Sequence, residues 1–297
     1  MSASRTAGTP ATLLAQDDWR ERERTHQHRV DRLTAAHRER RRDRRAHPVE
    51  DFLFTYYRHR PSQLRRWHPG VGVGLRGEAA GERNGWRHYR YADHTAYVDL
   101  DLFLRDRGET VRFVRDLLSA MLERPAYLGC FGLHEWAMVY RQRAGDVRHA
   151  SWPLRLGHDG TDAVVERHRI RCTHHDAFRF FTEAARPRNS LQPQRDSQVA
   201  MEQPGCLHAG MDVYKWAFKL TPAVPGELTV DCFELAREIR ELDMRASPYD
   251  LSELGYEPVP IETAEGKAEY VAAQRQFGER ARVLRRRLLA VCERLLG

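Results

Sequence analysis

Apolar residues recur at spacings of three, four and seven along much of this chain, a pattern that predicts amphipathic helices. In residues 15–45 the spaced positions are Trp19, His26, Val30 and Leu33. The last predicted helix, about residues 263–296, carries the strongly basic run RVLRRRLL. Further helices are predicted over residues 48–57, 105–125, 126–143, 176–187, 208–220 and 227–245.

Residues 71–103 follow a different pattern, with short runs rich in β-branched or aromatic residues. The turn before them, PGVG at residues 69–72, matches the hairpin with which helix–hairpin–helix proteins bind a DNA phosphate. The residues that follow, GLRGEAAGERNG, contain four glycines and no apolar stripe. They therefore predict strands of a β-hairpin rather than a second helix. Residues 150–172 are expected to be irregular or extended, ending in the strand-like DAVVERHRIRC.

These patterns predict one mainly α domain over residues 15–297, with a small antiparallel β insertion near residues 71–103 (α+β). The chain of 297 residues is long enough to bury a substantial core. No internal repeat or linker divides it, and residues 1–14 are expected to be disordered.

The positive charge is concentrated near the N-terminus. Residues 20–45 hold eleven arginines against five acidic residues, a net of +6 out of +7 for the whole chain. Charge alone therefore does not indicate a general nucleic-acid-binding face. The five cysteines form no Cys-x-x-Cys pair, which favours reduced thiols. No apolar run approaches the roughly 20 residues of a membrane span, and no secretory signal is evident, so we expect a cytoplasmic protein without a membrane partner.

Reactive side chains interrupt several of the apolar segments. The sequence GLHEWAMVY places His134 and Glu135 in an apolar helix. A buried carboxylate must be paired, metal-bound or protonated, because an isolated buried charge is costly. Glu135 is therefore either a candidate general base or one half of an internal ion pair with an arginine.

A second cluster, CTHHD, lies at the expected start of a helix, where Asp176 would cap the helix or complement its dipole. His175 and Arg179 lie four residues apart, so an anion or a carboxylate could bridge them.

The stretch EQPGCLHAGMDVYKWAFKL is the most suggestive of function. His208, Asp212 and Trp216 follow at intervals of four, so they share one helical face. Asp212 would orient His208, or activate a water beside an aromatic wall. Lys215 would pair with Asp212 across one helical turn, or act as an amine nucleophile if it is desolvated.

Cysteines accompany these histidines, and thiolate and imidazole are the usual zinc ligands. The spacings match no zinc motif, so we expect no metal. The alternative is a divalent metal bound by residues from these clusters, namely His134, His174, Cys172, Cys206 and His208. Asp231 and Glu234 would add oxygen ligands for a harder metal.

Five segments, HPVEDFLFTYY, LRRWHPG, GLHEWAMVYR, EQPGCLHAGMDVYKWAFKL and LDMRASPYDL, together resemble a family of actinobacterial proteins labelled 3-methyladenine DNA glycosylase. The similarity runs from about residue 15 to the end of the chain. It implies hydrolysis of the N-glycosidic bond of alkylated purines in duplex DNA, as in base-excision repair. An alkylated base is a good leaving group, so a carboxylate that positions water would suffice, without a metal or organic cofactor. The catalytic candidates are Glu135, Asp212, His208 and His175.

The resemblance also suggests how DNA would be held. Aromatic residues and one lysine would bind an extruded cationic base, unless they are ordinary core residues. These are Tyr56, Tyr57, Trp67, Trp136, Lys215 and Trp216. Arginines would bind the phosphate backbone. They are Arg40, Arg41, Arg42, Arg44, Arg45, Arg65 and Arg66, with Arg285–Arg287 in the last helix.

Two other classes of function remain open. A helical small-molecule enzyme, with or without a metal, would explain the concentration of His, Cys and Asp in apolar segments. A non-catalytic nucleic-acid-binding protein would explain the charged first helix but not the polar residues in the core.

Overall fold

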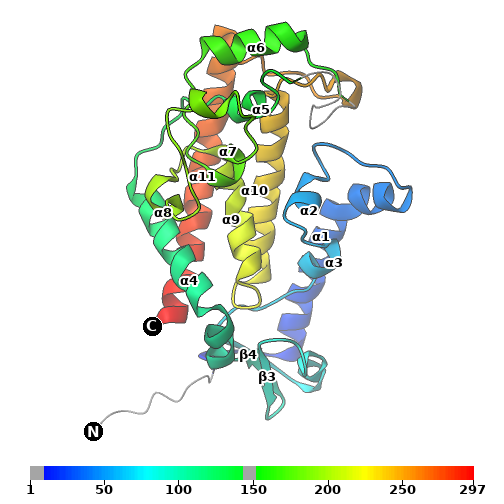
Figure 1. The fold of residues 1–297 in the computed structure, drawn as a ribbon. Coiled ribbons are helices and arrows are strands. Elements are labelled where there is room, and N and C mark those ends of the chain that lie inside the picture. Colours follow the sequence, from blue (N-terminus) through cyan, green and yellow to red (C-terminus); the bar gives the residue numbers. More distant parts are fainter. Residues whose placement is uncertain (1–9, 143–151) are drawn as a thin grey trace.

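The computed structural model describes residues 10–142 and 152–297. Within them the fold is mainly α-helical with one small four-stranded sheet at one end of the molecule, which confirms the predicted fold class (Figure 1). None of the described helices combines the length and the apolar composition that crossing a membrane requires.

Four long helices form the centre of the structure. They are α4 (Leu100–Glu123), α9 (Leu207–Lys219), α10 (Gly226–Arg245) and α11 (Ala264–Leu296). Helix α10 packs against both α9 and α11, and α11 packs in turn against α4. Their apolar residues meet in one continuous core, and α9 is buried along nearly its whole length. Two short pieces of 3₁₀-helix, Arg186–Arg188 and Ser252–Leu254, lie in the connecting segments.

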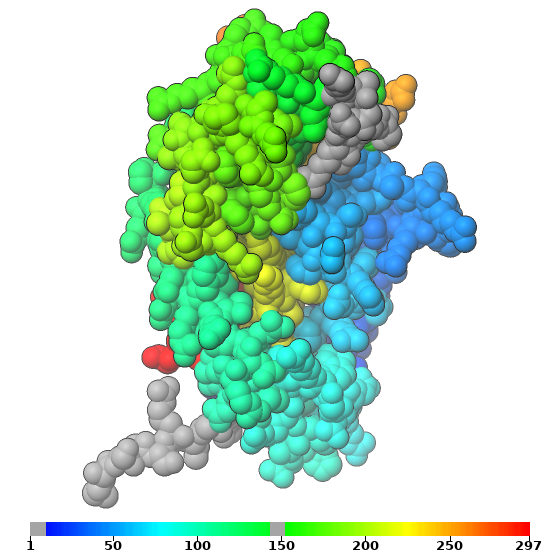
Figure 2. All heavy atoms as spheres, viewed as in Figure 1, coloured from blue at the N-terminus to red at the C-terminus, as the bar shows by residue number. Residues whose placement is uncertain are grey.

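The N-terminal segment covers one side of α10. Helix α1 (Gln16–Arg42) buries Trp19 and Val30, as its periodicity predicts, and contacts α10. Two short helices follow, α2 (Phe52–Tyr56) and α3 (Pro61–Leu64). Figure 2 shows this blue segment and the green segment of the middle of the chain closing over the yellow α9–α10 pair.

The sheet has the order β1-β2-β4-β3. Its strands are β1 (Thr12–Leu14), β2 (Val73–Arg76), β3 (Tyr89–Ala92) and β4 (Thr95–Val98). A strand thus follows the glycine-rich turn, as expected, and a 3₁₀-helix (Glu78–Arg83) separates β2 from β3. The sheet is mixed rather than purely antiparallel, because β1 pairs with β2 in parallel.

Strand β1 also corrects the expected disorder at residues 12–14, since pairing with β2 satisfies its backbone. The rest of that expectation, for residues 1–9, lies outside the described residues.

Among the described residues, four short helices connect α4 to α9. They are α5 (Leu133–Ala137), α6 (Gly157–Arg167), α7 (His175–Phe178) and α8 (Gln198–Met201). The prediction of a strand at DAVVERHRIRC is wrong, because the first half of this segment is helical. Thr161, Val164 and Val165 lie on one buried helical face, so packing outweighs the strand preference of β-branched residues. Helix α5 is far shorter than predicted, because Phe131 and Gly132 adopt positive φ immediately before it.

Candidate metal centre

Two neighbouring groups of buried histidines and carboxylates lie where α5, α7, α9 and α10 meet. The first, called the His134 group, comprises His134, Glu135, His208 and Asp243. The second, called the His174 group, comprises His174, Glu202 and Asp212. Within each group, one potential ligand atom per residue lies within 4.8 Å of all the others. Nitrogen and oxygen donors at this separation are able to surround a metal ion.

Local structure explains how these residues converge. His208 and Asp212 lie one turn apart on α9, and Asp243 lies near the end of α10, so the α9–α10 contact brings them together. His134 comes from α5, and His174 is the residue that caps α7. The His174 side chain accepts a hydrogen bond at Nδ1 from the backbone N–H of Ala177 (3.2 Å), which turns Nε2 towards the carboxylates.

In the His134 group an arginine from α10 joins the carboxylates. Nη1 of Arg240 donates to Glu135 Oε1 (2.8 Å) and to Asp243 Oδ2 (3.1 Å). The other oxygen of Asp243 lies 3.0 Å from His134 Nε2. Glu135 therefore forms the internal ion pair with arginine that was one of its two expected roles.

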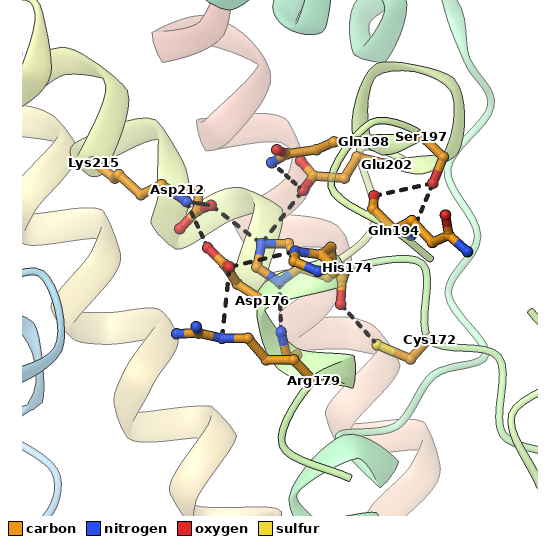
Figure 3. Close-up of polar contacts among 12 residues, drawn as sticks. Cys172, His174, Asp176, Arg179, Gln194, Ser197, Gln198, Glu202, Asp212 and Lys215 are labelled. Atoms are coloured by element: carbon orange, nitrogen blue, oxygen red, sulfur yellow. Dashed lines mark hydrogen bonds and ion pairs between the residues drawn. The ribbon is translucent and has the colours of Figure 1, made fainter. Parts of the chain in front are cut away.

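In the His174 group, His174 Nε2 lies 3.2 Å from Asp212 Oδ2 and 3.5 Å from Glu202 Oε1 (Figure 3). Lys215 Nζ donates to Asp212 Oδ2 at 2.5 Å, as the helical spacing predicts, and to Asp176 Oδ2 at 3.0 Å. The second oxygen of Asp212 accepts a hydrogen bond from the Tyr57 hydroxyl (2.7 Å).

His208 is the member of the His134 group that lies beside the His174 group. Its ring centroid is 4.2 Å from that of His134 and 5.3 Å from that of His174. Asp212 does not orient it, as the sequence had suggested, because Asp212 bonds to other partners. Nδ1 of His208 is buried and has no hydrogen-bond partner among the described residues. Burial and the nearby His134 hold the pKa of His208 well below its usual value, so its imidazole is neutral and able to bind a metal.

The charges of the groups shift the pKa values of their members. Burial alone would lower the pKa of His134, but the Asp243 carboxylate outweighs it and raises that pKa to about 10. Burial acts against the charged His174 too, yet Glu202 and Asp212 raise its pKa. Burial itself raises the pKa of Glu202. Desolvation opposes ionisation of Asp212, but Lys215 and His174 together hold its pKa far below the usual range.

Two small cavities adjoin the His134 group. One, of about 20 Å³, is lined by Glu135, His208 and Arg240 and by the aromatic side chains of Phe52, Tyr56 and Phe180. The other, of about 10 Å³, lies beside His134 and Cys206. The larger has room for about one water molecule. It lies between the N-terminal segment and the α7 segment, which Figure 2 shows meeting at the surface.

The structure brings together three of the four predicted catalytic residues, Glu135, Asp212 and His208. His175 is half-buried outside both groups, and its Nδ1 lies 3.6 Å from Asp176. Asp176 does not cap α7; it bridges Lys215, His175 and Arg179. It is therefore the carboxylate expected between His175 and Arg179.

Sequence reasoning missed Glu202, Arg240 and Asp243. A signal for two of them was present in the segment ELAREIRELDMR, because Arg240 and Asp243 occupy the buried face of α10. Asp231 and Glu234, suggested as oxygen ligands, lie on that helix too, but they pair with Arg29.

The cysteines expected in the alternative metal site do not belong to either group among the described residues. Burial raises the pKa of the Cys172 thiol to about 12 and that of Cys206 well above its usual value. Both are therefore thiols rather than thiolates. His134, His174 and His208 remain from that set as candidate ligands.

The aromatic residues take different positions. Tyr57 bonds to Asp212, Tyr56 lines the larger cavity, and Trp216 packs under the Lys215 ammonium group, 4.5 Å from the ring centroid. The other two indoles have structural partners. Trp136 donates to the carbonyl of Ala246, and Trp67 donates to Glu227.

Several arginines proposed to bind phosphate have protein partners. Arg40 pairs with Glu50 and Asp51, Arg65 with Asp31, and both Arg42 and Arg45 with Asp43. Arg66 lies over the Trp86 ring, and Arg41 and Arg44 are exposed. Arg287 pairs with Asp231, and Arg286 is exposed. Arg285 is completely buried and lies on no surface against which a DNA duplex would rest, so its expected contact with the DNA backbone is wrong.

The site thus combines neutral and charged imidazoles, carboxylates and two fixed cations in a buried cluster. Its composition suits a metal centre with room for a water ligand. No protein-family model, curated protein or solved structure matches this chain.

Proposed function

We propose that this protein is a metal-dependent enzyme that hydrolyses a small molecule. The observation that carries the proposal is the His134 group, in which imidazole and carboxylate donors converge and His208 Nδ1 has no partner among the described residues. The adjoining His174 group would hold a second ion or support the first. This is the metal-dependent form of the small-molecule enzyme considered from the sequence.

The balance of charge supports a bound cation. The two groups contain four carboxylates, and the fixed cations paired with them among the described residues are Arg240 and Lys215. The raised pKa values of His134 and His174 mean that protonated imidazoles balance the remaining negative charge when no metal is bound. A divalent ion would take the place of these protons and would give the unpaired His208 Nδ1 a partner.

The donor set supports the choice of metal and of reaction. Imidazole and carboxylate ligands without thiolate suit manganese, iron, cobalt or zinc. The cavity beside His208 has about the volume of one water molecule (about 20 Å³). A metal ion held by His208 and its neighbours would lower the pKa of such a water towards neutrality and would so supply a nucleophile for hydrolysis. The aromatic residues at the cavity would exclude bulk water from the reacting bond.

The test is metal analysis of the folded protein by mass spectrometry after growth with trace manganese, iron, cobalt and zinc. We expect at least one ion per chain, reduced at least tenfold in His208→Gln. The matched control is His59→Gln. His59 is as buried as His208, both at 8% exposure, and also has an unpaired Nδ1, but it stacks on Phe218 and belongs to neither group.

A folded wild-type protein that neither contains nor takes up a metal would show that the cluster is a structural ion network. The metal-loaded protein would then be screened against small ester, amide and phosphate substrates. Methylated duplex DNA belongs in the same screen, because the resemblance implies release of alkylated purines. Base release that survives chelation would favour the glycosylase hypothesis over a metal-dependent reaction.

A further inference from the structure

A large cavity of about 620 Å³ lies between the end of α4, one face of α11 and the loop before α9. Its size is typical of a pocket for a small organic ligand. None of the residues that line it belongs to the His134 or His174 group. It is therefore a separate feature of the molecule, on the α4–α11 side of the bundle (Figure 1).

The inner wall of this cavity contains Arg285, whose side chain is completely buried. Among residues 10–142 and 152–297, its guanidinium group makes one weak hydrogen bond, from Nη1 to the carbonyl oxygen of Pro204 at 3.4 Å. Nε and Nη2 are buried and have no hydrogen-bond partner among the described residues. Burial lowers the pKa of Arg285 to about 10, and the nearby Cys206 and Glu202 offset this only in part. A buried guanidinium group in this state lacks a counter-ion.

The two unpaired atoms are significant because Nε and Nη2 form one edge of the planar guanidinium group. Their N–H bonds are nearly parallel and match the two oxygens of a carboxylate or a phosphate. The lining of the cavity therefore includes a cation with two unpaired donors, and an anion would reach them once the Arg285 side chain turns from its buried position into the cavity.

The rest of the lining has two characters. Arg124, Arg275 and Arg282 add positive charge, which exceeds that of the two acidic residues present, Glu123 and Glu279. The α4 side is apolar and includes Met121, Leu122 and Leu128. Such a wall would cover the hydrocarbon body of a ligand whose charged end is held by Arg285.

We propose that this cavity binds a small amphipathic anion, with its carboxylate or phosphate group on the unpaired edge of Arg285 and its apolar body along the end of α4.

The proposal is tested by calorimetric titration of the purified protein with octanoate, octyl phosphate, inorganic phosphate and octan-1-ol. We expect saturable binding of octanoate or octyl phosphate, at least tenfold weaker binding of inorganic phosphate, and none of octan-1-ol. Whichever of the two amphipathic anions binds more tightly identifies the head group. Arg285→Met should weaken binding at least tenfold, and Arg285→Lys should also weaken it, because lysine lacks the two-donor edge. Arg286→Met, at the adjacent exposed position, is the control and should leave affinity unchanged.

The melting temperature without ligand gives a second readout. Arg285→Met should melt at the wild-type temperature or above it, because the substitution removes a buried charge without a counter-ion. A lower melting temperature would mean that Arg285 has a structural role, and this would overturn the proposal. Absence of saturable binding, or equal losses in Arg285→Met and Arg286→Met, would do so as well. If the Arg285 variants do not fold, Arg282→Met replaces them in the test. Arg282 lines the cavity and has an exposed side chain, and its substitution should weaken binding by about threefold.

Discussion

Arg240 shows how a single side chain holds the candidate site together. Its guanidinium group is 1% exposed and contacts Glu135 and Asp243, which come from different helices. Such a pair does not by itself make a protein more stable than an apolar alternative would. Removing only the cation is different, because the buried Glu135 then loses its positive partner and Asp243 keeps only His134.

We therefore expect Arg240→Met to lower the free energy of unfolding by about 3–5 kcal/mol, measured by urea denaturation of the metal-free protein. The control is Arg245→Met on the same helix. Arg245 lies nearer the surface, with a 3.3 Å ion pair to Glu269, so its loss should change stability by less than about 1 kcal/mol. Equal effects of the two substitutions would contradict the importance assigned to the buried contacts.

At the scale of elements, the long helices could be predicted and the short ones could not. Helices α1, α4, α9, α10 and α11 repeat their apolar spacing over three or more turns, which leaves little ambiguity. Helices α5 and α7 have five and four residues, so contacts with the rest of the protein decide their extent. A sequence window cannot show such contacts.

The same limit applied to the site. Its α9 half could be predicted, because His208 and Asp212 share a helical face with spacing visible in the sequence. Glu202 and Asp243 join them only through tertiary packing, and no local spacing connects these residues. The pairing of Glu135 with Arg240 spans 105 positions, so the sequence could indicate a partner but not identify it.

Helix α11 offers a test of how the elements are fixed in place. Gly266, in its first turn, lies against the backbone of Pro260 so closely that a Cβ atom would overlap the carbonyl oxygen. Gly266→Ala should therefore lower the melting temperature, although alanine normally favours a helix.

The matched control for that substitution is Gly108→Ala in α4, where a Cβ would meet only the Arg112 side chain at an ordinary 3.6 Å. There we expect stabilisation of roughly 0.5–1 kcal/mol, measured by thermal and urea unfolding. If both alanine variants were stabilised, the close approach at Pro260 would not constrain the start of α11.

At the scale of the whole molecule, the candidate metal centre joins parts of the chain that are distant in sequence. Its members span residues 134 to 243 and come from the short-helix region as well as from the central bundle. An ion bound there would connect α5 and the α7 segment to α9 and α10. Metal binding would therefore strengthen the attachment of the short-helix region to the bundle. The gain should appear as a higher free energy of global unfolding.

We expect manganese or cobalt at about 1,000 times its dissociation constant to stabilise the chelator-treated protein by about 4 kcal/mol, which corresponds to roughly 5–10 °C in melting temperature. Calcium is the control, because it has the same charge but prefers sites formed entirely by oxygen ligands. It should produce little shift, and His208→Gln should abolish most of the manganese or cobalt effect.

Hydrogen exchange on the metal-loaded protein should also slow in α5 and α7 more than in α4, which contributes no ligand. Equal shifts with calcium and the transition metals would instead indicate a general ionic effect and would leave the cluster as a network of buried ion pairs.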